Sequence, residues 1–258
     1  QKYKKSIIDV LVTSRNREAY FNNKNINNAR VLSLNPVSIM FFMLKNNKKY
    51  DLVIDMEEYL NVSAIIAFFV GKRRIGFSHG VRASLYTDRI DYNDKQHIVY
   101  TFLDLLKPLG IRKKADRLKK LNYSTNDKRN VDSLLKKHNI AKKNFIVGLG
   151  VGAAESVKER MWPKERFAQV ADYLVDKYKA KIILFGNKEE KNLAENVMRL
   201  IKNKNNAFNF AGKTSAKEMF YLTGFCRLFI GNDAGPMHVA AAQGTKTVGL
   251  FGCNLPVR

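Results

Sequence analysis

Cysteine is scarce in this chain of 258 residues, which holds two, Cys226 and Cys253. They lie far apart, without a metal-ligating neighbour at a useful spacing, and this argues against a disulfide scaffold or a zinc ribbon. The four histidines are also scattered, so we expect no metal site. Such cysteine usage fits a reducing compartment, and we expect a cytoplasmic protein.

Long hydrophobic runs are also missing. The longest nearly continuous one extends from Val62 to Val70 and is interrupted by Ser63, which is too short to span a bilayer. The first residues, QKYKK, lack the apolar stretch of a signal peptide. Because the first residue is not Met, we expect the true N-terminus to be missing. The sequence also lacks a Walker lysine motif, a G-x-S-x-G elbow and an H-E-x-x-H motif.

Acidic residues are few: 23 Asp and Glu stand against 46 Lys and Arg, which gives a net charge of +23. This surplus suggests an anionic partner, which could be nucleic acid, an anionic membrane face or a phosphorylated substrate. The alternative explanation is that the positive charge only keeps a Lys- and Asn-rich protein soluble. No aromatic-interleaved basic motif is present, so we do not expect nucleic acid as the partner. Much of the surplus precedes Lys143, which favours the first half as the part that faces a polyanion or a membrane surface.

Hydrophobic residues are plentiful, at 45%, and the length suits two domains. Short apolar runs alternate with helical patterns, which is typical of an α/β protein with parallel sheets. In the second half we expect strands at 144–149, 181–185, 207–210, 228–231 and 245–251, with helices at 163–178, 189–201, 215–223 and 236–243. In the first half we expect strands at 7–13, 29–34, 50–55 and 73–77, with helices at 38–45, 59–70 and 96–109. The polar stretch 113–130 reads as a connection, followed by a helix at 131–138.

The segment FIGNDAGPMHVAAAQGTKTVGLFG, from Phe229 to Gly252, carries the strongest motif. A strand is expected to end beside Asp233, and Pro236 opens a helix that carries His238. Gly235 has no Cβ, so a ligand can approach the backbone, and the N–H groups and dipole of a helix start attract phosphate. Parallel sheets bind ligands beyond the carboxyl ends of their strands. An ordinary turn with a buried histidine explains the same residues equally well.

The segment GLGVGAAESVKERMWP, from Gly148 to Pro163, also follows an expected strand. It matches G-x-G-x-x-A but lacks the helix that should follow a dinucleotide fingerprint directly. We interpret it as a glycine-rich loop whose N–H groups meet phosphate, with Lys158 or Arg160 supplying charge. The alternative is a surface loop with solvated charges.

The segment GNKEE, from Gly186 to Glu190, follows a third strand. A carboxylate there could accept both hydroxyls of a ribose, although acids in the first turn of a helix more often complement its dipole. Together, the three strand ends suit a nucleoside diphosphate better than any single motif does.

These residues resemble the lipopolysaccharide heptosyltransferases, the family 9 glycosyltransferases. The likeness rests on DAGPMH at Asp233–His238 with the later AAA and LFG, on RMWP at Arg160–Pro163, and on GKTS at Gly212–Ser215. In the first half, YDLVID at Tyr50–Asp55 and KRRIGF at Lys72–Phe77 also look like family elements.

The resemblance implies a GT-B-like architecture of two Rossmann-like domains facing a cleft. We expect an acceptor domain at 1–112, a connection at 113–143 and a nucleotide-sugar domain at 144–258. It also implies inverting, metal-independent transfer of a sugar, heptose from ADP-heptose in well-known members, to a lipopolysaccharide core or related glycan, without a cofactor. The acceptor is then a phosphorylated glycolipid, and we expect the basic first half to hold it in peripheral contact with the anionic inner membrane. Carried over by position, the substrate-binding set is Asp233, Ala234, Gly235 and His238 at the sugar and diphosphate, Arg160 and Lys158 at the phosphates, Glu190 or Glu189 at the ribose, and Thr214 in the GKTS turn.

Three departures from the family pattern matter. Arg160 stands where Lys is usual, and Ala234 stands where Ser or Thr is usual. The N-terminal Gly-Asp loop that would supply the catalytic base is not found, and neither are the helices after LFG, so we expect a chain truncated at both ends. Such a chain could bind the donor and still lack catalysis. The alternatives are therefore a non-catalytic nucleotide-sugar or anion-binding protein and, on charge alone, a nucleic-acid-binding module.

Overall fold

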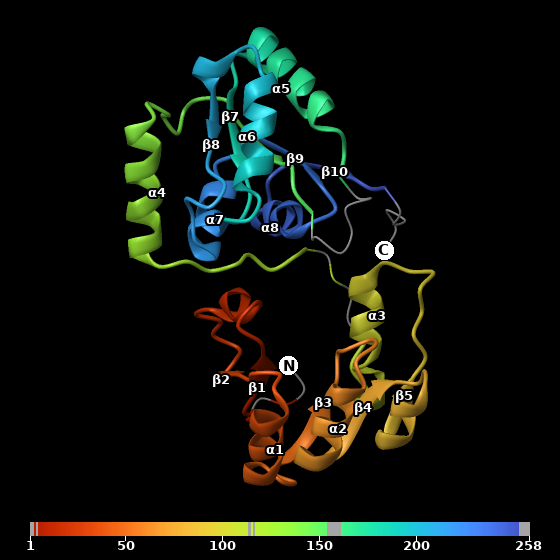
Figure 1. The fold of residues 1–258 in the computed structure, drawn as a ribbon. Helices are drawn as coiled ribbons and strands as arrows, with labels where there is room; N and C mark the ends of the chain where they lie inside the picture. The colour runs from red at the N-terminus through yellow and green to blue at the C-terminus, as the bar shows by residue number, and fades with distance from the viewer. Residues whose placement is uncertain (1–2, 4, 113–114, 116, 154–160, 253–258) are drawn as a thin grey trace. The chain divides into compact units, whose positions relative to one another are not determined.

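The computed structural model describes residues 3, 5–112, 115, 117–153 and 161–252, and it divides into two compact units (Figure 1). The N-terminal unit is built mainly from residues 24–116 with the first residues of the chain. The C-terminal unit is built from residues 117–255 together with Glu18–Asn23. The predicted alternation of strands and helices is thus found in both.

The N-terminal unit contains two parallel sheets. β1 (Asp9–Val12) pairs with β2 (Asn28–Val31), and a second sheet has the order β3 (Tyr50–Ile54), β4 (Gly71–Phe77) and β5 (Asp88–Ile90). Its helices are α1 (Pro36–Lys45), α2 (Asn61–Val70) and α3 (Ile98–Asp104), with 3₁₀ turns η2 (Val81–Leu85) and η3 (Lys107–Leu109). A further 3₁₀ turn, η1 (Arg17–Tyr20), lies mainly in the segment Glu18–Asn23 of the C-terminal unit. Side chains of α1 and α2 pack around Leu32, Ile39, Ile66 and Val70.

Two expectations for the N-terminal unit need correction. The strand β5 was not predicted, because its three residues DRI carry two charges and too little apolar pattern. The ion pair between Arg73 and Asp88, at 2.7 Å, helps to fasten it to β4. The single helix expected at 96–109 is two pieces, α3 and η3, since Pro108 cannot donate the hydrogen bond that would continue α3.

The C-terminal unit has one parallel sheet of five strands in the order β10-β9-β6-β7-β8. The strands are β6 (Ile146–Gly150), β7 (Lys181–Phe185), β8 (Ala207–Asn209), β9 (Leu228–Asn232) and β10 (Thr247–Leu250), and all five were predicted. Its helices are α4 (Thr125–Lys137), α5 (Lys164–Tyr178), α6 (Lys191–Leu200), α7 (Ala216–Thr223) and α8 (Gly235–Gln243), with a 3₁₀ turn, η5 (Lys204–Asn206). Helix α4 begins earlier than expected, because Ser124 and Asp127 form a reciprocal capping box.

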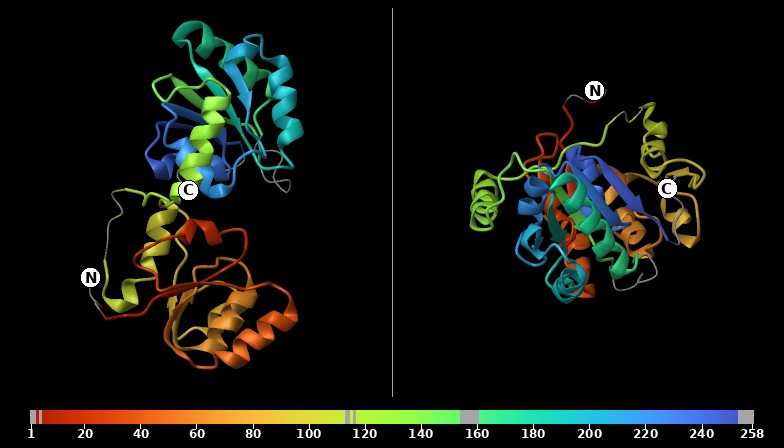
Figure 2. Two further views of the ribbon diagram at one scale, coloured as in Figure 1. Left: turned by 90° about the vertical axis from the view of Figure 1, so that its left-hand side faces the viewer. Right: turned by 90° about the horizontal axis from the view of Figure 1, so that it is seen from above.

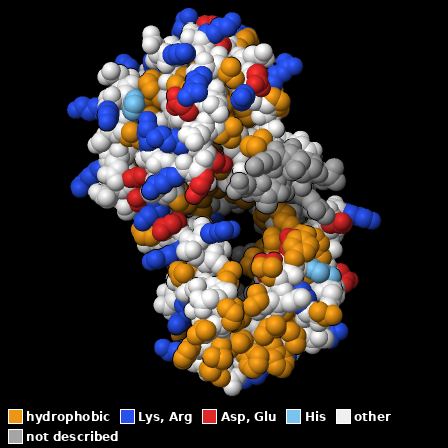
Figure 3. All heavy atoms as spheres, in the orientation of Figure 1, with side chains coloured by type: hydrophobic (Ala, Val, Ile, Leu, Met, Phe, Trp, Pro, Cys, Tyr) orange, Lys and Arg blue, Asp and Glu red, His pale blue; other side chains and the backbone are white. Residues whose placement is uncertain are grey.

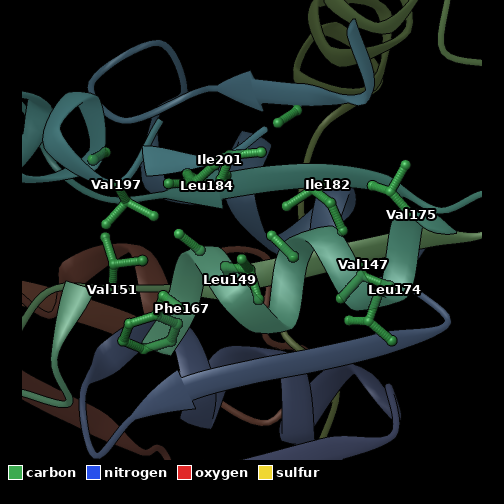
Figure 4. Close-up of a cluster of buried hydrophobic side chains, with 14 of the residues drawn as sticks. Val147, Leu149, Val151, Phe167, Leu174, Val175, Ile182, Leu184, Val197 and Ile201 are labelled. Atoms are coloured by element: carbon green, nitrogen blue, oxygen red, sulfur yellow. The ribbon is translucent and has the colours of Figure 1, made fainter. Parts of the chain in front are cut away.

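Helices cover both faces of this sheet (Figures 1 and 2). On one face, α5 and α6 pack on β6 and β7. Figure 4 shows the cluster of buried side chains between them, which includes Phe167 of α5, Val197 of α6, Leu149 of β6 and Leu184 of β7. On the other face, α4, α7 and α8 pack through Val131, Leu222 and the buried ring of Phe229. Every residue of β6 is buried, as expected for the central strand of a sheet covered on both sides. This packing fixes where the strands end, and therefore where the loops that follow them lie.

Candidate functional site

The carboxyl ends of β9, β6 and β7 lie next to one another, because these strands are neighbours in a parallel sheet. We call residues 151–152, 186–190 and 232–238, which end or follow these strands, the strand-end row. Open α/β sheets bind ligands beyond this edge. Neighbouring strands are separated by roughly 4.8 Å, so the groups after β7 and β9 lie on the order of 10 Å apart across the end of β6.

Asp233 and His238 form a pair at the β9 end of the row. The Nε2 atom of His238 lies 3.1 Å from Oδ1 of Asp233, and the imidazole is 64% exposed while the carboxylate is 11% exposed. The backbone N–H of Asp233 donates to the carbonyl of Leu250 at 3.0 Å, which ties the pair to β10. A carboxylate that holds an exposed imidazole in one orientation prepares it to donate to, or accept from, a bound group.

The start of α8 leaves backbone open to a ligand. Its N-cap residue, Ala234, makes no side-chain capping bond, since it lacks the hydroxyl of Ser or Thr. A Cβ added to Gly235 would meet no atom of the described residues within 4 Å. This helix start therefore combines an uncapped dipole with room for a group to approach the main chain, as phosphate sites require.

Glu190, rather than Glu189, lies against the neighbouring strand end. Its Oε2 accepts from the backbone N–H of Asn187 at 2.8 Å, and the Asn187 side chain accepts from the backbone N–H of Glu190 at 2.8 Å. A Cβ added to Gly152, after β6, would lie 1.8 Å from Oε1 of Glu190. Glu189 is exposed. Glycine at 152 is thus what allows this carboxylate to lie over the end of β6.

The turn that holds Thr214 lies beyond β8, at the far end of the sheet. It is linked to β7 by a hydrogen bond from the N–H of Gly212 to the carbonyl of Gly186, at 3.0 Å. Gly212 has φ of +72°, a conformation that favours glycine, and a Cβ added there would lie 3.1 Å from Cα of Lys188. Thr214 is half-buried, next to the capping box between Ser215 and Glu218 that starts α7.

Two of the sequence-predicted cations, Lys158 and Arg160, lie outside the described residues. The structure resumes at Met161, and the N–H of Trp162 donates to Oδ1 of Asn232 at 2.9 Å. Asn232, Asn187 and Gly152 were not singled out from the sequence. An asparagine at the end of a buried strand can be recognised in the sequence as a candidate structural residue. Its hydrogen-bond partners cannot, because they come from segments that only the fold brings together.

A second polar cluster, also not foreseen, lies in the N-terminal unit. Asp55, directly after β3, accepts from Arg82 at 3.0 Å and from the hydroxyl of Tyr86 at 2.7 Å. All three are buried, and Nη1 of Arg82 is a buried nitrogen without a partner among the described residues. Burial, and then the hydrogen bond to Asp55, raise the pKa of Tyr86 well above its usual value. The sequence feature that could have indicated this cluster is an acidic residue, Asp55, directly after a buried strand.

The described residues offer hydrogen-bonding and charged groups but no cluster of three or more metal-ligating side chains. Within the described part of the chain, no helix is long and apolar enough to cross a bilayer. The strand-end row instead places a carboxylate after β7, about 10 Å from an open helix start with an oriented imidazole after β9. That spacing suits a nucleotide laid across β6.

Comparison with known proteins identifies the family. The model of glycosyltransferase family 9 (heptosyltransferase) matches residues 43–258. Lipooligosaccharide heptosyltransferase 2 of Campylobacter jejuni is 38% identical over 109 residues, which cover 42% of this chain and 33% of the relative. The chain spans between 32% and 62% of the length of the curated relatives compared with it.

Solved structures share the fold. A family 9 glycosyltransferase of Veillonella parvula has a TM-score of 0.87 at 23% identity, covering 98% of this chain and 74% of that one. The Escherichia coli heptosyltransferase WaaC, solved with ADP, has a TM-score of 0.71 at 16% identity, covering 97% of this chain and 78% of that one. The predicted α/β, GT-B-like fold class is confirmed. With the family match extending over most of its length, the chain belongs to glycosyltransferase family 9.

Proposed function

We propose that this chain is part of a glycosyltransferase that moves a sugar, heptose from ADP-heptose, to a lipopolysaccharide core or related glycan. The observation that carries the proposal is the strand-end row of the C-terminal unit. Its acid after β7 and its open helix start after β9 are spaced for the two ends of a nucleoside diphosphate. Family membership supports the reaction class, and the names of the relatives support the sugar and the acceptor.

In this proposal Glu190 accepts hydrogen bonds from the ribose hydroxyls, with Glu189 as the weaker candidate because it is exposed and does not lie over β6. Gly235 and the N–H groups at the start of α8 hold the diphosphate. Asp233 orients His238 toward the sugar and its phosphate. Arg160 and Lys158 add positive charge, and Thr214 and Ala234 border the same edge.

The transfer proceeds by attack of an acceptor hydroxyl on the anomeric carbon of the donor sugar. A new glycosidic bond forms, the bond from that carbon to the diphosphate oxygen breaks, and the configuration inverts. A carboxylate base takes the proton of the hydroxyl. Fixed N–H dipoles and the Arg160 guanidinium stabilise the charge that develops on the departing nucleoside diphosphate. No metal or cofactor is required in this scheme.

Contact with an anionic membrane is supported by α1. Its exposed apolar residues recur at helical spacing, at Val37, Met40, Phe41 and Leu44, each about half or more exposed. Figure 3 shows hydrophobic side chains gathered over this part of the N-terminal unit. The lysines at 45, 48 and 49 follow directly and are exposed. An apolar face bordered by lysines suits a peripheral position at anionic lipid, where the acceptor glycolipid resides.

The donor site is tested by calorimetry with ADP and ADP-sugars against UDP and UDP-sugars. We expect the adenine series to bind and Arg160→Ala to bind it about tenfold more weakly, since one charged hydrogen bond is lost. Arg227→Ala is the matched control. Arg227 is exposed and directly precedes β9, so it lies at the end of the sheet opposite to the strand-end row. Equal affinity of wild type and Arg160→Ala would remove Arg160 from the site, and no nucleotide binding at all would refute the proposal.

Membrane contact is tested separately by sedimentation with vesicles of phosphatidylglycerol or phosphatidylcholine. We expect binding to the anionic vesicles only, and less of it for Phe41→Ser, because the change removes an exposed ring from the apolar face. Tyr173→Ser, at a 54% exposed ring on α5, is the matched control. Unchanged sedimentation of Phe41→Ser would show that α1 does not face the lipid.

A further inference from the structure

One buried amide, the side chain of Asn232, links the two sides of the strand-end row. Asn232 is the last residue of β9 and is 1% exposed. Its Nδ2 donates to the carbonyl of Val151, directly after β6, at 2.8 Å. Its Oδ1 accepts from the N–H of Trp162, just before α5, at 2.9 Å. Both ends of the amide are therefore used, and both partners belong to the connection that follows the neighbouring strand.

The chemistry of these two bonds specifies an amide. The Val151 carbonyl can only accept and the Trp162 N–H can only donate, so the side chain between them must supply a donor and an acceptor at once. Aspartate at position 232 would still accept from the Trp162 N–H, but its second oxygen would face the Val151 carbonyl oxygen and could not donate to it. A hydrophobic side chain leaves both backbone groups buried and unpaired, which costs more than the hydrogen bonds themselves contribute.

One group that Asn232 holds, the Val151 carbonyl, and Asn232 itself are each one residue away from a group of the candidate site. Val151 precedes Gly152, whose Cα lies under the carboxylate of Glu190. On its own strand, Asn232 precedes Asp233, whose carboxylate contacts His238. The amide thus fixes the position of the β6 exit relative to the β9 exit. It does so beneath the place where the nucleotide would lie.

We infer that Asn232 is a positioning residue for nucleotide binding: its amide sets the separation between Glu190, which rests on the β6 exit, and the Asp233–His238 pair. The inference rests on the proposed function, because it concerns the same donor site. Asn232 itself, being buried, does not contact the nucleotide. Its effect is transmitted through the backbone of Val151 and Gly152.

The experiment compares Asn232→Asp with a matched change at Gln243, using ADP as the probe. Gln243 is also a buried amide, at the opposite end of α8, where its Nε2 donates to the carbonyls of Leu121 at 3.0 Å and Phe220 at 2.9 Å. Gln243→Glu therefore removes the same kind of buried donor away from the strand-end row. Thermal melts of both variants define a temperature at which each is folded, and ADP affinity is measured there by calorimetry.

We expect both variants to melt at a lower temperature, but only Asn232→Asp to lose ADP affinity, by about tenfold, the size that one buried hydrogen bond gives. Gln243→Glu should bind ADP within about twofold of wild type. Should Asn232→Asp not fold, Asn232→Ser carries the same test, because it removes the reach of the amide without burying a charge.

Wild-type affinity in the folded Asn232 variant, or an equal loss in Gln243→Glu, would overturn the inference and leave the amide with a structural role only. Failure of the wild-type chain to bind ADP is a different result. It would refute the proposed donor site, and this inference with it.

Discussion

Substitution of Gly152 by alanine tests whether Glu190 has to lie over the end of β6. The added Cβ would lie 1.8 Å from Oε1 and 2.4 Å from Cδ of Glu190, whereas non-bonded atoms need at least about 3 Å. Because the side chain is flexible, the carboxylate is expected to turn away rather than the strand to move. The hydrogen bond from the Asn187 N–H, at 2.8 Å, is then lost or weakened.

The expected cost to folding is small. Glu190 is half-buried, so losing one N–H to carboxylate bond should lower the free energy of unfolding by about 1 kcal/mol. That corresponds to a fall in Tm of about 3–5 °C for a domain of this size. ADP binding is expected to weaken about tenfold in Kd, since the ribose loses its hydrogen-bond acceptor. Differential scanning calorimetry and titration calorimetry measure the two effects on the same samples.

A double-mutant cycle with Glu190→Ala supplies the control. In that background the atoms that would clash with the new methyl group are gone, so Gly152→Ala should change ADP affinity little further. If the two substitutions instead weaken binding additively, or if Gly152→Ala alone binds ADP as wild type does, Glu190 is not the group through which Gly152 acts and the assignment of the ribose site is wrong.

Three further predictions concern other parts of the C-terminal unit. Gly235→Ala should leave Tm unchanged or higher, since the added Cβ meets nothing within 4 Å in the part of the chain that the structure describes. It should still weaken ADP binding about tenfold, because the methyl group fills the space through which the phosphates approach, and unchanged affinity would place the phosphates elsewhere. Burial, and then Lys213, lower the pKa of His138, so the unfolded chain binds the proton more readily and stability should fall as pH drops below about 6.5. Melts of His138→Phe should lack that fall, and an identical pH profile would contradict the assignment. Burial raises the pKa of Cys226 to about 12, so peptide mapping should find its thiol unmodified by iodoacetamide at pH 8 until urea unfolds the protein, and rapid labelling of the folded state would contradict that burial.

The C-terminal sheet could be predicted from the sequence because its strands are buried on both faces. Runs such as KIILF at Lys181–Phe185 are then almost wholly apolar and bounded by glycine or polar residues. Strands of the N-terminal unit carry more charged residues, and β5, with two charges in only three residues, was missed for that reason. The start of α4 was missed although its capping box, Ser124 with Asp127, is visible in the sequence, because the surrounding residues are polar.

The site could be predicted only as a set of residue types at strand ends. The pairing of Asp233 with His238 is local, and a helix start with these residues close together suggests it. The contact between Glu190 and Gly152 and the amide bridge of Asn232 to Val151 join segments that are far apart in the chain, and only the strand order brings them together. The buried Arg82 had no sequence signal, since a charged side chain is ordinarily expected at the surface.

Amide hydrogen exchange of the chain with and without ADP tests the central claim most directly, because it locates binding without any substitution. The account predicts slower exchange in peptides that cover 151–152, 186–190 and 232–238, with the strands of the N-terminal unit unchanged. Protection confined to the N-terminal unit, or no protection anywhere at saturating ADP, would contradict it.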